Sequence, residues 1–151
     1  DGEAVCPPVY FTKRVEQGIA AMYPNGVLVL NDDMIKRITH DEAVFVLAHE
    51  YAHYKFAHTK QRMTVIAKSV VDNAYMIKEP EDALAYSMFF LGVKDAHYAY
   101  EHQADAYAFD YIKTKNIQID CNGMMQRIAG DVVVSTDKHS SISERCAAYR
   151  P

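Results

Sequence analysis

A pair of histidines four residues apart, set in a long stretch without glycine or proline, constrains this chain more than any other feature. The pair belongs to the H-E-x-x-H pattern His49-Glu50-Tyr51-Ala52-His53. Residues four positions apart lie one above the other on the same face of an α-helix, so both imidazoles can bind one zinc ion. Glu50 can then act as a general base beside that ion. The alternative is a surface helix whose two histidines are solvated.

The residues around this pattern predict a buried helix over residues 41–60. Thr39 and Glu42 have the spacing of a capping box, in which each side chain accepts a hydrogen bond from the backbone N–H of the other residue. The residues expected to face the core recur at helical spacing: Val44, Leu47, Ala48 and Tyr51. A buried helix would give the site the rigidity and dryness that suit metal chemistry.

A catalytic zinc site needs a third protein ligand and one open position. Glu101 is the strongest candidate, because Asp105 follows it on the same helix face and can accept the second ring N–H of a zinc-bound histidine. The alternative for these two carboxylates is a solvated acidic face. On a continuous helix, His58 would lie about 140° around the axis from His53. The sequence therefore favours His58 as a surface histidine or as a support for a ligand.

Four recognisable segments are spread along most of the chain. They are a glycine-led strand, an acidic-capped helix with the H-E-x-x-H pattern, an E-x-x-A-D pattern, and a C-terminal segment with a histidine and an arginine: residues 25–31, 39–58, 101–105 and 139–145. Together they resemble the gluzincin metallopeptidases of the HtpX and CAAX-prenyl-endopeptidase type, including their small soluble minigluzincin relatives. The set is far more specific than any one segment.

The resemblance implies a role for each matching residue. His49, His53 and Glu101 would bind one zinc ion, and Glu50 would be the general base. Asp105 would orient His49. The activity implied is that of a zinc metalloendopeptidase.

The C-terminal segment is implied to complete the site. His139 would lie near the substrate carbonyl and stabilise the developing oxyanion, and Arg145 would be a structural or electrostatic partner. Ser140 departs from the family pattern, which usually has proline at this position. The loop with His139 can therefore be less fixed than in the family. Without the resemblance, His139 and Arg145 would be interpreted as surface polar residues.

The whole pattern predicts one α+β domain over residues 1–151, with an extended tail at residues 1–8. We expect a gluzincin-like fold, in which a small antiparallel-containing sheet lies beside the active-site helix and several further helices. A hairpin is predicted where residues 17–23 and 27–31 flank Pro24-Asn25-Gly26. Residues 9–15 are predicted as a third strand, with a short helix as the alternative. Further helices are expected over residues 32–38, 62–78, 81–91, 95–115, 121–129 and 143–149.

The strand before the active-site helix is predicted to bind substrate. Val27, Leu28, Val29 and Leu30 would form an edge strand that pairs with extended polypeptide backbone. Backbone pairing gives affinity without sequence preference, which suits an endopeptidase that acts on unfolded or flexible polypeptides. The alternative function is a latent or non-catalytic domain that has a peptidase fold and binds zinc or peptide.

Composition limits the other partners. The chain has 16 Lys and Arg against 20 Asp and Glu, a net charge of −4, so no basic excess favours nucleic acid. The longest uncharged apolar stretch near the middle of the chain, residues 83–93, is too short to span a bilayer.

The cysteines bear on the compartment. Cys121 and Cys146 bracket His139 and can form a disulfide in an oxidising compartment, whereas free or buried thiols are the equal alternative for all three cysteines, including Cys6. The sequence starts at Asp1, which is compatible with removal of an N-terminal region. We therefore expect an extracytoplasmic protein, periplasmic or secreted, with a soluble cytoplasmic domain as the alternative.

Overall fold

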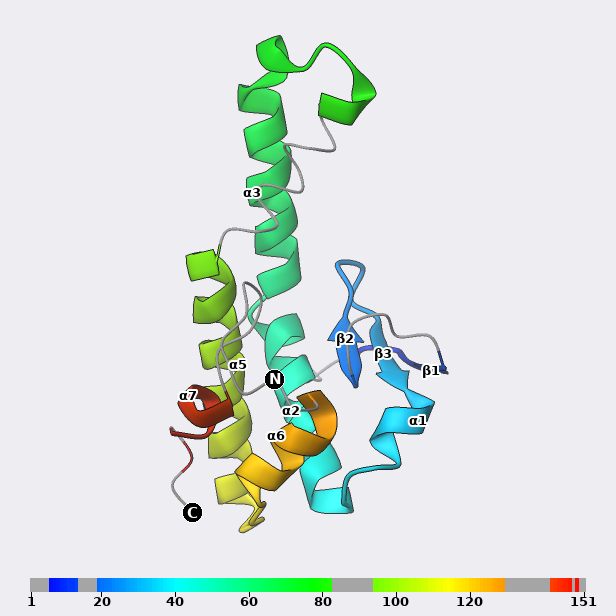
Figure 1. Cartoon of the computed structure of the whole chain (residues 1–151), viewed down its shortest axis with the longest axis vertical. Helices are drawn as coiled ribbons and strands as arrows, with labels where there is room; N and C mark the ends of the chain where they lie inside the picture. Colours follow the sequence, from blue (N-terminus) through cyan, green and yellow to red (C-terminus); the bar gives the residue numbers. More distant parts are fainter. Residues whose placement is uncertain (1–5, 14–18, 83–93, 130–141, 148, 150–151) are drawn as a thin grey trace, which may run out of the picture.

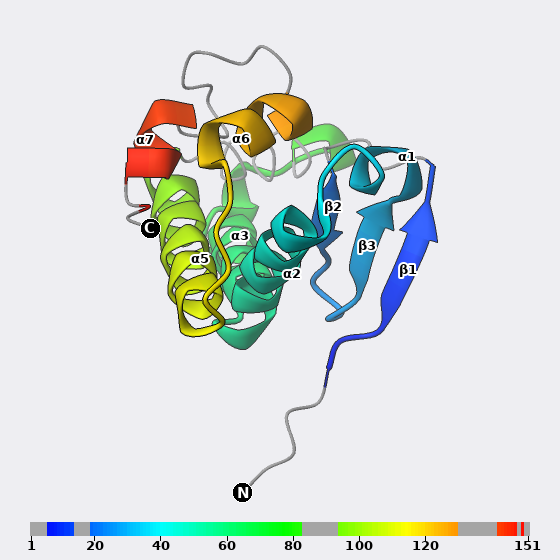
Figure 2. The ribbon, with the colours of Figure 1, turned by 90° about the horizontal axis from the view of Figure 1, so that it is seen from below.

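A three-stranded mixed sheet lies beside two long helices in the computed structural model of this chain (Figure 1). The structure describes residues 6–13, 19–82, 94–129, 142–147 and 149. Seen from below, α2 (His40–Lys55) stands between the sheet and α5 (Lys94–Thr114) (Figure 2). This layering confirms the predicted α+β class.

The sheet has the strand order β1-β3-β2. β2 (Ala20–Met22) and β3 (Leu28–Asn31) are antiparallel and form the predicted hairpin, whereas β1 (Val9–Thr12) runs parallel to β3. Gly26 in the hairpin turn has a φ of 79°, a left-handed conformation that glycine adopts without steric cost. β3 is therefore the central strand of the described sheet.

The predicted substrate-binding edge at Val27, Leu28, Val29 and Leu30 is wrong. β3 pairs with β2 on one side and with β1 on the other, so its backbone N–H and C=O groups are used within the sheet. Leu28 and Leu30 are also buried, each with 3% of its surface exposed. The third strand, itself predicted, covers the side of β3 that the hairpin alone would leave open.

α2 starts where the capping box predicted. Thr39 Oγ1 accepts a hydrogen bond from the Glu42 backbone N–H at 3.2 Å, and Glu42 Oε2 accepts one from the Thr39 N–H at 2.8 Å. Because the helix has the sheet on one side and α5 on the other, it buries apolar side chains toward both: Phe45, Val46, Ala48 and Ala52. Of the expected core residues, Leu47 is 38% exposed and Val44 and Tyr51 are only partly buried.

The helix predicted over residues 41–60 ends earlier than expected. α2 ends at Lys55, and α3 (His58–Asp72) begins after Ala57, whose φ of 54° is left-handed. α3 corresponds to the helix predicted over residues 62–78 but starts four residues sooner, and the 3-10 helix η1 (Ala74–Met76) follows it. α3 projects away from the sheet, beyond the rest of the fold (Figure 1).

The other predicted helices are present where the structure describes them. α1 (Asp32–Ile35) and α7 (Ile142–Ala147) are shorter than expected, and α6 (Cys121–Ala129) has the predicted bounds. The predicted helix over residues 81–91 lies almost entirely outside the described residues. A buried cluster joins α2, α5 and α6; its largest members are Phe45, Phe109, Ile112, Met124 and Met125.

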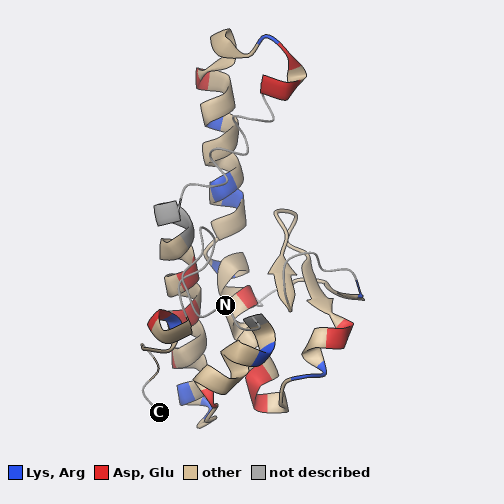
Figure 3. Cartoon of the chain, viewed as in Figure 1, with Lys and Arg blue, Asp and Glu red and all other residues tan. Residues whose placement is uncertain are grey.

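Charged residues of both signs occur along the helices (Figure 3). Among the helices that the structure describes, none is both long enough and apolar enough to cross a lipid bilayer.

Candidate metal centre

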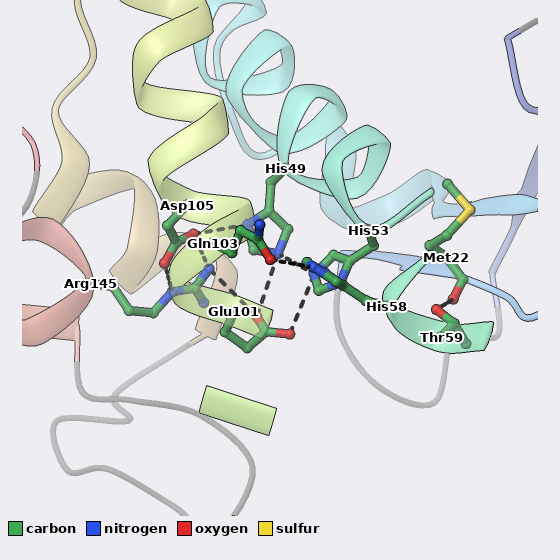
Figure 4. Close-up of polar contacts among 9 residues, drawn as sticks. All are labelled: Met22, His49, His53, His58, Thr59, Glu101, Gln103, Asp105 and Arg145. Atoms are coloured by element: carbon green, nitrogen blue, oxygen red, sulfur yellow. Dashed lines mark hydrogen bonds and ion pairs between the residues drawn. The ribbon is translucent and has the colours of Figure 1, made fainter. Parts of the chain in front are cut away.

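Three side chains from two helices converge between α2 and α5 (Figure 4). His49 Nε2 and His53 Nε2 are 3.1 Å apart, and each is 3.4 Å from a carboxylate oxygen of Glu101. Ligand atoms at about 2.0–2.1 Å from a tetrahedral zinc ion are themselves about 3.4 Å apart. The donor types and their spacing therefore fit one zinc ion held by His49, His53 and Glu101.

The second ring nitrogen of His49 has a buried carboxylate partner. His49 Nδ1 donates to Asp105 Oδ1 at 2.8 Å, since an ionised carboxylate can only accept. Asp105 is 2% exposed and comes from α5, one helical turn beyond Glu101. A hydrogen bond at Nδ1 leaves Nε2 as the nitrogen that can bind a metal.

Arg145 of α7 reaches the same carboxylate. Its Nε and Nη2 donate to the two oxygens of Asp105 at 2.8 and 2.7 Å, and its Nη2 is 4.0 Å from Glu101. Burial alone would raise the pKa of Asp105, but Arg145 and His49 outweigh it and hold this pKa at about 2. Asp105 therefore stays ionised as the acceptor for His49.

Burial and neighbouring charges shift the pKa values of the two histidines in opposite directions. Burial opposes a charge on His49, but hydrogen bonds with Asp105 and Glu101 outweigh it and raise its pKa to about 10. Burial, together with the charge of His49, lowers the pKa of His53 to about 3. Burial acts against ionisation of Glu101, yet its bond with His49 keeps its pKa well below the usual range. Without metal, His49 therefore carries a second ring hydrogen and a positive charge, whereas His53 is neutral.

Glu50 lies beside these ligands and is itself buried. Burial raises the pKa of its carboxyl to about 7, while the charge of His49 and a backbone hydrogen bond with Met22 act in the opposite direction. Met22 belongs to β2, so the hairpin contacts the carboxyl group of the motif. A general base is most effective when its pKa is close to the working pH.

The structure decides between the two alternatives for His58 and adds Gln103, which the sequence did not assign to the site. His58 packs against His53, with their Nδ1 atoms 3.0 Å apart, and His58 Nε2 is 2.9 Å from Gln103 Oε1 (Figure 4). The angle of about 140° between His58 and His53 assumed a continuous helix. The left-handed Ala57 ends that helix and turns His58 back toward the site. No glycine or proline marks this break.

One predicted site residue cannot be placed: His139 lies outside the described residues. Near it in sequence, Cys146 of α7 forms a disulfide with Cys121 of α6. This disulfide is one of the two alternatives that the sequence left open. It fixes α7 beside α6 and with it the neighbouring Arg145.

A cleft of about 430 Å³ opens next to His53. The hairpin turn, residues 22–26, lines one wall. The junction of α2 and α3 lines the other with His53, Tyr54, Lys55, Ala57, Thr59 and Lys60. The Met22 carbonyl accepts a hydrogen bond from Thr59 Oγ1 at 3.3 Å, so the two walls are joined at this strand. The cleft therefore borders β2 at Met22 and, of the three candidate ligands, is lined by His53.

Comparison with known families agrees with this geometry. The family model described as Peptidase family M48 matches residues 17–148. No curated protein and no solved structure matches the chain significantly. The matched region contains both helices of the candidate metal centre, and the chain belongs to peptidase family M48, a family of metallopeptidases.

Proposed function

We propose that this protein is a zinc-dependent endopeptidase that hydrolyses peptide bonds in unfolded or flexible polypeptides. The observation that carries the proposal is the spacing of the three ligand atoms, 3.1 to 3.4 Å, in a buried site of a family M48 chain. The finer resemblance to the HtpX and CAAX-prenyl-endopeptidase type belongs to the same proposal.

The residues of the candidate metal centre have different roles in the proposed reaction. His49, His53 and Glu101 hold the ion, and Asp105 fixes the ring of His49 through Nδ1. A zinc ion bound there would polarise the scissile carbonyl and lower the pKa of a water molecule toward about 7. Glu50 takes a proton from the attacking water and delivers it to the leaving amine.

His139 is proposed to donate a hydrogen bond to the oxyanion, on the strength of the family-like spacing from His139 to Arg145. Arg145 approaches the metal centre through Asp105. Losing one oxyanion donor costs about 10²–10³ in kcat. His139→Phe should therefore lower turnover by this factor without changing the zinc content.

The substrate strand is proposed to pair with β2 instead of β3. β2 is an edge of the described sheet, and Met22 lines the cleft beside His53. Because the Met22 carbonyl accepts from Thr59, a substrate strand that pairs there would replace this hydrogen bond. An extended peptide added at a sheet edge gains affinity from its backbone and leaves its side chains for pockets. Backbone recognition of this kind requires an unfolded or flexible substrate.

Metal analysis combined with a cleavage assay tests the proposal. The purified protein should hold one equivalent of zinc and cleave casein, and a chelator should abolish cleavage until zinc is restored. A protein that holds zinc without cleaving casein would instead be a latent or non-catalytic binding domain. Cleavage that survives complete removal of the metal would overturn the zinc-dependent mechanism.

A further inference from the structure

His58 is a buried histidine that the steps above do not use. It begins α3, and only 1% of its surface is exposed. Both of its ring nitrogens nevertheless have polar partners within hydrogen-bond distance. Nδ1 faces His53 Nδ1 at 3.0 Å, and Nε2 faces Gln103 Oε1 at 2.9 Å (Figure 4).

The partners leave only one arrangement of hydrogens that suits a metal ligand. The Gln103 carbonyl oxygen can only accept, so His58 Nε2 carries the hydrogen. A neutral imidazole has one donor and one acceptor, so His58 Nδ1 must accept from His53 Nδ1–H. His53 Nε2 is then left with a free lone pair, and this atom is the one that faces His49 and Glu101.

The fold holds the His58 ring in this orientation. The left-handed Ala57 interrupts the helix between α2 and α3 and places His58 against His53 in the last turn of α2. The ring stacks on Tyr100 with centroids 4.5 Å apart and on Phe56 with centroids 5.6 Å apart. Two aromatic neighbours and two polar partners therefore fix both the plane and the rotation of the ring.

We propose that His58 and Gln103 act as positioning residues that hold His53 as the Nδ1–H tautomer, the form that can bind a metal through Nε2. They do for His53 what Asp105 does for His49. The two supports differ in charge, because His49 has a carboxylate partner and His53 a neutral imidazole. The proposal rests on the proposed zinc site, and it adds a requirement that the ligands alone do not state.

Two substitutions distinguish the effect of the hydrogen-bond acceptor on His58 from the effect of its aromatic ring. His58→Phe keeps an aromatic ring for Tyr100 and Phe56 but has no acceptor for His53. In His58→Asn, the amide oxygen can take the place of Nδ1. We expect His58→Phe to weaken zinc binding by roughly 10–100-fold, the range for loss of a ligand's hydrogen-bond partner, and His58→Asn to recover much of the loss. Competition with a chromophoric chelator measures both, and the cobalt-substituted absorption spectrum reports the ligand geometry.

Matched variants guard against a general loss of folding. His40→Phe changes an exposed histidine, with 90% of its side-chain surface exposed, at the other end of α2 and should leave zinc affinity unchanged. Gln103→Leu removes the acceptor for His58 Nε2 and should also lower zinc affinity. Circular dichroism of the metal-free proteins should show the same fold throughout.

Nitrogen NMR of the histidine rings tests the tautomers directly in the wild-type protein. We expect hydrogen on Nδ1 of His53 and on Nε2 of His58. Three results would each overturn the proposed positioning role while leaving the proposed function intact. They are a hydrogen on Nδ1 of His58, equal zinc affinity in His58→Phe and wild type, and no recovery of zinc affinity in His58→Asn. A wild-type protein that bound no zinc would overturn both.

Discussion

The charged side chains at the candidate metal centre leave negative charge that a divalent cation would balance. Arg145 makes two hydrogen bonds to Asp105 but lies 4.0 Å from Glu101, so the Glu101 carboxylate is only weakly paired by arginine. In the metal-free site, a proton on His49 supplies the missing positive charge. Zinc would replace that proton and add charge beside Glu101 and Glu50.

This balance predicts how many protons zinc displaces. At pH 6, His49 is charged because its pKa is raised to about 10, His53 is neutral because its pKa is lowered to about 3, and Glu101 is ionised. Zinc can bind only the neutral form of His49. Titration calorimetry in buffers of different ionisation enthalpy should therefore find about one proton released per zinc ion.

The Glu50→Gln variant is the right background for this experiment, because Glu50 has a pKa of about 7 and would add its own proton near pH 6. If zinc binding to that variant released no protons, His49 would be neutral in the metal-free protein and the charge balance described here would be incorrect.

Asp105 should matter to zinc affinity through His49. Asp105→Ala removes the acceptor for His49 Nδ1 and leaves Arg145 without its partner, so zinc affinity should fall by roughly 10–100-fold. Asp110→Ala is the matched control, because Asp110 is exposed on the same helix. A zinc dissociation constant that is the same in wild type and both variants would show that Asp105 does not support zinc binding through His49.

At the level of elements, the sequence predicted what local rules control. The capping box of Thr39 and Glu42 placed the start of α2, and the turn around Gly26 placed the hairpin. The break at Ala57 was missed because a left-handed alanine is unfavourable by itself and packing has to impose it. The same break explains why spacing alone could not decide whether His58 lies at the surface or supports a ligand.

α7 is an element whose position depends on a covalent bond. It has only six residues and buries none of them fully, so it has little packing of its own. The Cys121–Cys146 disulfide closes a loop with a sequence separation of 25, which predicts a stabilisation of about 3 kcal/mol. The double variant Cys121→Ser with Cys146→Ser should unfold roughly 6–12 °C lower than wild type.

Cys6→Ser is the control for this measurement, because Cys6 is exposed and outside the disulfide. The double variant should also bind zinc more weakly, since α7 carries Arg145 to Asp105. Equal melting temperatures in the double variant, Cys6→Ser and wild type would show that the bond contributes nothing to the folded state.

At the level of the whole molecule, the sequence could predict the ligands and the carboxylate partner of His49, but not the contact between His58 and Gln103 that supports His53. His49 and His53 were recognisable because their spacing is fixed by one helix. Glu101 and Asp105 lie on another helix and were candidates from their spacing of four residues, whereas Arg145 was tied to the site by the family-like segments alone. The order of the sheet was not predictable in this way, because strand pairing is a tertiary choice, and β3 was misassigned to an edge.

The proposed compartment can be tested on the intact chain. A disulfide persists in an oxidising environment, so the Cys121–Cys146 pair supports the proposal that the protein is extracytoplasmic. Alkylation of the native protein, isolated without reductant, should label Cys6 alone. Labelling of Cys121 and Cys146 in protein taken from its own cells would favour a reducing compartment instead.

Comparison of the wild-type protein with Glu50→Gln tests the central claim most directly. Both proteins should bind one zinc ion, because His49, His53 and Glu101 are unchanged. Cleavage of an unfolded polypeptide should fall by about 10²–10⁴ in the variant, since an amide cannot take up the proton of the attacking water. A zinc-loaded Glu50→Gln protein that kept more than about a tenth of the wild-type rate would contradict the account, given that range for general-base catalysis.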